Sequence, residues 1–86
     1  MVNKYKFLIY GRSSCPFCVK SEQMLKFKKQ ECQFFDLEND RQFLEEAKIF
    51  YQHNTVPIVL SIDKDSGKVS KVGGSDDLKE WLRDTL

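Results

Sequence analysis

Two cysteines, Cys15 and Cys18, are separated only by Pro16 and Phe17, directly after a short apolar segment that stops at Gly11. A pair this close can serve as a metal clamp, a structural disulfide or a reversible redox pair. Each use makes a different demand on the fold, because a metal clamp needs further ligands, whereas a redox pair needs a reactive thiol within reach of substrate. The use of this pair therefore constrains how the rest of the chain is arranged.

The length and charge of the chain exclude several classes of protein. Its 86 residues suffice for one hydrophobic core, so we expect a single domain over residues 1–86. Fourteen Lys and Arg against 13 Asp and Glu give a formal net charge of +1, which provides no basic field for nucleic acid. The apolar run at residues 7–10 is far shorter than the ~18 residues that span a bilayer, and it lacks a signal-peptide pattern. We expect a cytoplasmic monomer that binds neither nucleic acid nor membrane.

A reducing compartment argues against a structural disulfide, because cytosolic thiols are kept reduced. A zinc site needs four ligands, and the remaining candidates, Cys32 and His53, form no second close pair, so we expect no metal. Cys32 is interpreted as a partly buried small hydrophobe, with an exposed regulatory thiol as the alternative. His53 is assigned to the end of a helix. A redox pair remains the favoured hypothesis for Cys15 and Cys18.

Hydrophobic periodicity and turn residues predict seven elements in the order βαβαββα. The expected strands cover residues 4–10, 32–37, 56–62 and 69–72, of which the last two form a hairpin through the turn sequence DKDSGK. The expected helices run from Pro16 to Gln30, from a cap at Asn39 or Asp40 to His53 or Asn54, and from a cap at Ser75 along the apolar stripe of Leu78, Trp81, Leu82 and Leu86.

Pro16 is favoured in the first turn of a helix, which puts Cys15 at the helix N-terminus. Unpaired N–H groups there, together with the cation of Arg12, favour the thiolate of Cys15, which we predict to be the nucleophile. Cys18 lies one turn further on and is predicted to attack a mixed disulfide on Cys15 and release the substrate. Phe17 is expected to expose its ring beside the site, with a core position as the alternative.

Three motifs together resemble a dithiol glutaredoxin over nearly the whole chain: CPFC at residues 15–18, TVP at 55–57 and GGSDDL at 73–78. The resemblance implies an α/β, thioredoxin-like fold with a four-stranded mixed sheet flanked by three helices. It also implies that Pro57 follows a cis peptide bond and faces the nucleophile. Three features depart from the family's pattern: Phe17 replaces the commoner tyrosine, Asn54 replaces a basic residue, and the hairpin after Pro57 is long.

The same resemblance implies a glutathione site. Val56 would pair its backbone with that of the tripeptide, Asp77 would hold the γ-glutamyl amine, and the helix start at Gly74 would receive the γ-glutamyl carboxylate. Arg12 would lie near the glycyl carboxylate and the nucleophilic sulfur. The implied glutathione-binding residues are Arg12, Phe17, Thr55, Val56, Pro57, Gly74, Ser75, Asp76 and Asp77.

We therefore predict a glutathione-dependent thiol–disulfide oxidoreductase that reduces protein disulfides and glutathione mixed disulfides, with glutathione as its reducing cosubstrate. Its expected partners are glutathione and disulfide-containing or glutathionylated proteins, with ribonucleotide reductase as one candidate. Two alternatives stay open. One is a glutaredoxin-like redoxin that is reduced by thioredoxin reductase, and the other is a module that holds an iron–sulfur cluster between two subunits.

Overall fold

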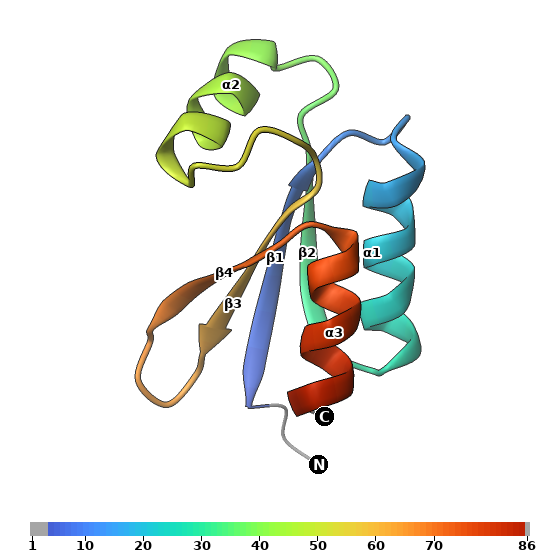
Figure 1. Cartoon of the computed structure of the whole chain (residues 1–86), viewed down its shortest axis with the longest axis vertical. Helices are drawn as coiled ribbons and strands as arrows, with labels where there is room; N and C mark the ends of the chain where they lie inside the picture. Colours follow the sequence, from blue (N-terminus) through green and yellow to red (C-terminus); the bar gives the residue numbers. More distant parts are fainter. Residues whose placement is uncertain (1–3, 86) are drawn as a thin grey trace.

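A computed structural model describes residues 4–85 and arranges them as three helices around one four-stranded sheet (Figure 1). The strands are β1 (Tyr5–Gly11), β2 (Glu31–Asp36), β3 (Ile58–Asp63) and β4 (Val69–Gly73). The helices are α1 (Pro16–Phe27), α2 (Arg41–Phe50) and α3 (Ser75–Thr85). The predicted element order βαβαββα is confirmed.

The sheet combines parallel and antiparallel neighbours in the order β2-β1-β3-β4. β1 runs parallel to β2 and antiparallel to β3, and β4 returns antiparallel to β3. Gly67, with a φ of 74°, lies in the turn that joins β3 to β4. Glycine adopts this left-handed conformation without the clash that a Cβ would cause. The predicted mixed sheet and the predicted hairpin of β3 and β4 are therefore confirmed.

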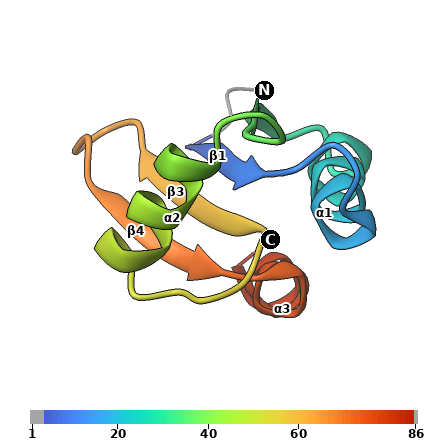
Figure 2. The same ribbon diagram turned by 90° about the horizontal axis from the view of Figure 1, so that it is seen from above.

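Side chains along β1 alternate between the two faces of the sheet, as the two-residue period of a strand requires. Phe7 and Ile9 face α1 and α3, whereas Leu8 and Tyr10 face α2. Figure 2 shows α1 and α3 on the side of the sheet away from α2. The larger core cluster consists of Phe7, Ile9, Leu25, Val59, Leu78 and Leu82. The smaller cluster consists of Ala47, Ile58 and Leu60. The α1–α3 layer thus holds most of the core.

α1 ends at Phe27, three residues before the predicted end at Gln30. The chain leaves the helix at Lys29, which takes a φ of 55°, and the N–H of Gln30 then donates to the carbonyl of Leu25 at 2.9 Å. A left-handed residue after a helix satisfies the terminal carbonyls in this way, and it is usually glycine or asparagine. Because Lys29 is neither, the sequence offered no signal for this end.

α2 begins as predicted, since the carboxylate of Asp40 accepts a hydrogen bond from the N–H of Phe43 at 3.1 Å. It ends at Phe50, earlier than the predicted end near His53, because Gln52 takes a φ of 53°. The N–H of His53 then donates to the carbonyl of Lys48 at 2.9 Å. His53 consequently lies in the segment after the helix, where its ring approaches Thr55 and Gly74.

β3 begins at Ile58, two residues after the predicted start at Val56. Pro57 has no N–H and cannot donate to the strand ladder, so the pairing starts after it.

In α3, the ring of Trp81 packs edge-to-face on Phe7, with ring centroids 5.2 Å apart. Leu86, the last residue of the predicted apolar stripe, lies outside the described residues. No helix within residues 4–85 has the length and apolar character needed to cross a membrane.

Candidate active site

Cys15 is the N-cap residue of α1, as predicted, and Pro16 follows it in the first turn. Its backbone is extended, with φ −89° and ψ 117°, and its carbonyl accepts the N–H of Val19 at 3.1 Å. The N–H of Cys15 donates to the carbonyl of Arg12 at 3.0 Å, which folds residues 12–15 into a tight turn. The half-buried Cys15 thus lies where the helix dipole favours negative charge.

Cys18 is fully buried on the first turn of α1. Burial raises the pKa of Cys18 to about 12, although the N–H of Arg12, 3.5 Å from Sγ, acts in the opposite direction. A thiol with so high a pKa is protonated at neutral pH and is a poor nucleophile. The two cysteines therefore differ in exposure: Cys15 is partly exposed and can meet a substrate, whereas Cys18 is buried.

Gly11 provides the space in which Cys18 lies. A Cβ at Gly11 would be 2.6 Å from Sγ of Cys18 and 3.0 Å from its Cβ. Distances this short are far inside van der Waals contact, so another residue at this position would push α1 away from β1. The absence of a side chain at the end of β1 therefore lets the first turn of α1 pack directly on the strand.

Two carboxylates that the sequence analysis did not single out fix the loop between β1 and α1. Glu38 accepts hydrogen bonds from the N–H of Ser14 at 3.0 Å and from the guanidinium of Arg12 at 2.8 and 3.1 Å. Asp36 accepts the N–H groups of Ser13 at 3.1 Å and of Glu38 at 3.0 Å. The loop that precedes Cys15 is thus anchored to the carboxyl end of β2.

This network lowers the pKa of both carboxyl groups. The hydrogen bonds of Ser14, together with the guanidinium of Arg12, hold the pKa of Glu38 at about 2. The N–H groups of Glu38 and Ser13 likewise lower the pKa of Asp36. Arg12, predicted to lie beside the nucleophilic sulfur, therefore has its guanidinium bound to Glu38, while its backbone N–H lies against Cys18.

A groove of about 600 Å³ runs between the segment before β3 and the start of α3. Its lining residues are Phe17, Lys48, His53, Thr55, Val56, Pro57, Gly74, Ser75, Asp76 and Asp77. All the predicted glutathione-binding residues except Arg12 are therefore brought together, and the Val56–Pro57 bond is cis, as predicted. Phe17 is 59% exposed, which excludes the alternative of a core aromatic. Arg12 lines an adjacent depression that shares Lys48 and Val56 with the groove.

Lys48 and His53 are groove residues that the sequence analysis missed. Nζ of Lys48, on α2, lies 3.5 Å from the carboxylate of Glu45. Nε2 of His53 lies 3.4 Å from Oγ1 of Thr55 and would be 3.7 Å from a Cβ at Gly74. The groove therefore has basic side chains from α2 and the segment after it, and carboxylates from the start of α3. His53 lies near Asp77, because a Cβ at Gly74 would be within 4 Å of both side chains.

Asp77 also has a structural role at the start of α3. Its Oδ2 accepts the N–H of Gly74 at 2.9 Å, while the N–H of Leu78 donates to the Gly74 carbonyl at 2.9 Å. Gly73 has a φ of 119°, a conformation that favours glycine. The side chain of Asp77 thus closes the turn that leads into α3, which places the N-terminal end of this helix at the groove.

Cys32, the third cysteine, is half-buried against the larger core cluster, and burial raises its pKa. This position agrees with its interpretation as a small hydrophobe. Within residues 4–85, no three His, Cys, Asp or Glu side chains gather as the ligands of a metal ion.

Comparison with known proteins connects this geometry to a family. Residues 7–65 match the family model described as Glutaredoxin, and no curated protein sequence gives a match. The solution structure of a glutaredoxin from Brucella melitensis is similar with a TM-score of 0.67 and 24% identity, covering 93% of this chain and 80% of that one. The solution structure of the dithiolic glutaredoxin of Trypanosoma brucei brucei is similar with a TM-score of 0.68 and 22% identity, covering 91% of this chain and 77% of that one. The crystal structure of a buckwheat glutaredoxin–glutathione complex is similar with a TM-score of 0.69 and 20% identity, covering 95% of this chain and 72% of that one.

The contact between Gly11 and Cys18 leads to a stability prediction. Gly11→Ala will lower the free energy of unfolding, measured by urea denaturation, by about 1–3 kcal/mol, because the added methyl group overlaps Sγ. The matched control repeats the substitution in a Cys18→Ala background, where Sγ is absent. There the cost of Gly11→Ala will be smaller, and an equal cost in both backgrounds would show that the overlap is not its cause.

The Glu38 network leads to a prediction of pH dependence. Since the pKa of Glu38 is about 2 in the folded chain and 4.5 in the free side chain, its charge stabilises the fold above pH 4.5. This contribution is lost as pH falls toward 2. The difference in urea midpoint between the parent and Glu38→Gln will therefore narrow from pH 6 to pH 2. Glu80→Gln, at an exposed site on α3, serves as the control, and an unchanging difference for Glu38→Gln would contradict the network's role.

Proposed function

This chain belongs to the glutaredoxin family and is a thiol–disulfide oxidoreductase, and from that premise we propose that it works with glutathione. Its proposed substrates are protein disulfides and glutathione mixed disulfides of proteins. The observation that carries the proposal is the groove of about 600 Å³, which joins the exposed ring of Phe17 to the start of α3. The similar buckwheat glutaredoxin was solved as a complex with glutathione.

The chemistry of the groove supports a tripeptide with two carboxylates and one amine. N–H groups at the start of α3 suit a carboxylate, and the side chains of Asp76 and Asp77 suit a neighbouring amine. Lys48 suits the second carboxylate at the other end. Val56 precedes the first paired residue of β3, so its backbone suits hydrogen bonding to an extended peptide. γ-Glutamyl-cysteinyl-glycine carries these groups in this order.

For a glutathionylated protein, the proposed reaction begins when the thiolate of Cys15 attacks the glutathione sulfur of the mixed disulfide. The S–S bond of the substrate breaks, the protein thiolate leaves and takes a proton from water, and a disulfide forms between Cys15 and glutathione. A second glutathione thiolate then attacks the glutathione sulfur of this disulfide. Glutathione disulfide leaves as the oxidised product, the two electrons supplied by the second glutathione remain on the protein thiol, and Cys15 returns as thiolate.

For a protein disulfide, the thiolate of Cys15 attacks one of the two sulfurs, the S–S bond breaks, and the other sulfur leaves as a thiolate that takes a proton from water. Cys18 then attacks Sγ of Cys15, the bond between Cys15 and the protein breaks, and the second protein sulfur leaves as a thiol with the proton that Cys18 gives up. A Cys15–Cys18 disulfide remains. Two glutathione molecules then reduce this disulfide in sequence. Because burial raises the pKa of Cys18, the reaction starts at Cys15 and not at its partner.

The two alternatives raised by the sequence make different demands. A redoxin would turn over with thioredoxin reductase and NADPH but not with glutathione, and a cluster-binding module would be coloured when purified without oxygen. A colourless protein with glutathione-coupled turnover supports the proposal over both.

The division of labour between the cysteines is tested by Cys18→Ser. This variant will retain reduction of a glutathionylated peptide and lose reduction of a protein disulfide, because only the second reaction needs a resolving thiol. Both are measured as NADPH consumption coupled through glutathione and glutathione reductase. Cys32→Ser, which changes the remaining cysteine, will retain both activities. Retention of protein disulfide reduction by Cys18→Ser would contradict the proposed role of Cys18.

The proposed glutathione orientation is tested by Lys48→Ala. Loss of one charged hydrogen bond to a carboxylate will raise KM for a glutathionylated peptide about tenfold while kcat changes little. Glu45→Ala is the matched control, because it removes the ion-pair partner of Lys48 and leaves the cation in the groove. A KM for Lys48→Ala no higher than that for Glu45→Ala would show that glutathione does not use this end of the groove.

A further inference from the structure

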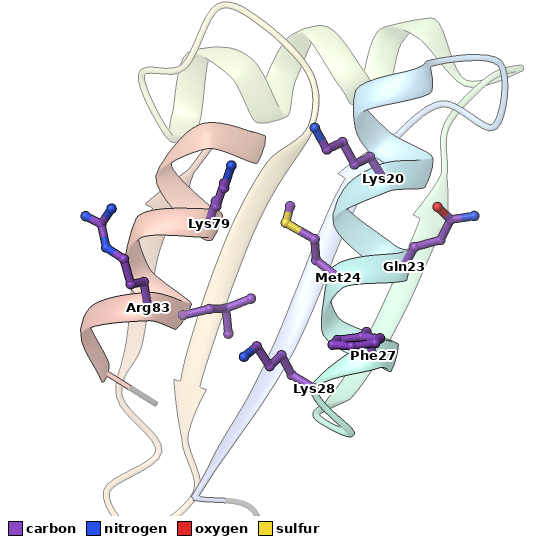
Figure 3. Close-up of a pocket in the computed structure, with 8 residues that line it drawn as sticks. Lys20, Gln23, Met24, Phe27, Lys28, Lys79 and Arg83 are labelled. Atoms are coloured by element: carbon purple, nitrogen blue, oxygen red, sulfur yellow. The ribbon is translucent and has the colours of Figure 1, made fainter.

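A second groove, of about 650 Å³, lies between α1 and α3, on the flank of the molecule away from α2 (Figure 3). Its lining residues are Lys20, Gln23, Met24, Phe27, Lys28, Lys79, Leu82 and Arg83. None of them belongs to the proposed glutathione site. Figure 3 shows Lys20 and Met24 extending from α1 toward α3.

The floor of this groove is apolar. Met24 is half-buried and packs on the larger core cluster, and Leu82 is a buried member of that cluster. Phe27 at the end of α1 is 83% exposed. Leaving a ring of this size in water is unfavourable relative to burying it. The groove therefore offers apolar surface that a bound partner would shield from water.

The walls of the groove are basic on both sides. Lys20 comes from α1 and Lys28 is the C-cap of that helix, Lys79 and Arg83 come from α3, and no Asp or Glu is among the described residues that line the groove. Within residues 4–85, the ammonium groups of Lys20, Lys28 and Lys79 make no ion pair, whereas Arg83 lies 3.2 Å from Asp84. In a chain of net charge +1, the groove thus gathers four cations, and three of them, the lysines, have no ion-pair partner among the described residues.

Helix dipoles do not account for these charges. Cations at the C-terminal end of a helix are favoured, which explains Lys28 at the C-cap of α1 and Arg83 in the last turn of α3. Lys20 and Lys79 are each the fifth residue of their helix, close to the end where the dipole favours anions. Their presence on facing walls of one groove therefore calls for another explanation.

We infer that the groove binds an acidic amphipathic helix of a partner protein. Two neighbouring helices form a trough into which the apolar ridge of a third helix packs, and Met24, Phe27 and Leu82 supply the contact surface. Lys20 and Lys28 are eight residues apart, or about 12 Å along α1, so the cations follow the length of the trough. Such a distribution matches carboxylates on both sides of an apolar stripe better than it matches one lipid headgroup.

The location of the groove relates this binding to the redox site. α1 carries Cys15 at its N-terminus and contributes Lys20 and Met24 to the groove. A protein held in the groove therefore contacts the same helix whose N-cap carries the sulfur that attacks disulfides. That the partner is a disulfide substrate rests on the proposed function, whereas the binding step does not.

The binding step is tested with a synthetic, fluorescein-labelled helical peptide that has a leucine stripe flanked by glutamates and contains no cysteine. Fluorescence anisotropy will show binding to the parent protein that weakens about tenfold in Lys20→Glu/Lys79→Glu. Lys26→Glu/Lys68→Glu, with the same change of net charge outside the groove, will bind the peptide within about twofold of the parent. Met24→Gln will weaken binding about fivefold through loss of apolar contact.

Equal weakening in both charge-reversed variants, or no binding to the parent, would overturn the inference. Phosphatidylserine vesicles form a parallel arm, and vesicle binding that depends on Lys20 and Lys79 without peptide binding would assign the groove to a membrane surface instead. Far-UV circular dichroism verifies that each variant is folded. Because anisotropy needs no turnover, failure of glutathione-dependent activity would leave this result standing, and the reverse also holds.

Discussion

The direct packing of the first turn of α1 on the end of β1 is the contact on which the redox site depends. It is possible because Gly11 has no side chain where Cys18 must lie. The same approach seals Cys18 in the interior and leaves Cys15 at the N-cap, half-buried and reachable. The missing side chain at Gly11 thereby gives two chemically identical thiols different environments. Burial raises the pKa of Cys18, whereas Cys15 lies at the N-cap of α1.

The parallel pairing of β1 and β2 provides the second constraint, because it brings the carboxyl ends of both strands to one edge of the sheet. Gly11 stands opposite Asp36 in this register, and the residues that follow each strand meet there. Asp36 and Glu38 can therefore accept the N–H groups of Ser13 and Ser14. A loop whose donors are satisfied by fixed carboxylates holds the position of Cys15 without help from a ligand.

The sequence predicted what local chemistry determines. Pro16 predicted the start of α1, and Asn39 or Asp40 predicted the start of α2. Apolar periodicity and turn residues predicted the order of the helices and strands along the chain. It did not predict features that depend on contacts between distant segments. The guanidinium of Arg12 binds Glu38, 26 residues away, and that pairing requires the β1–β2 register. Lys48 reaches the groove only because of how α2 lies over the sheet, which no periodicity encodes.

Helix α3 shows how a nearly neutral chain can present two differently charged sites. Its first turn carries Asp76 and Asp77 at the groove proposed for glutathione, in agreement with the helix dipole. From its fifth residue it carries Lys79 and Arg83 on the flank shared with α1, while Leu78 and Leu82 lie in the core between these surfaces. The net charge of +1 is thus a sum over separated patches. Recognition by this molecule therefore depends on the separate patches and not on the net charge.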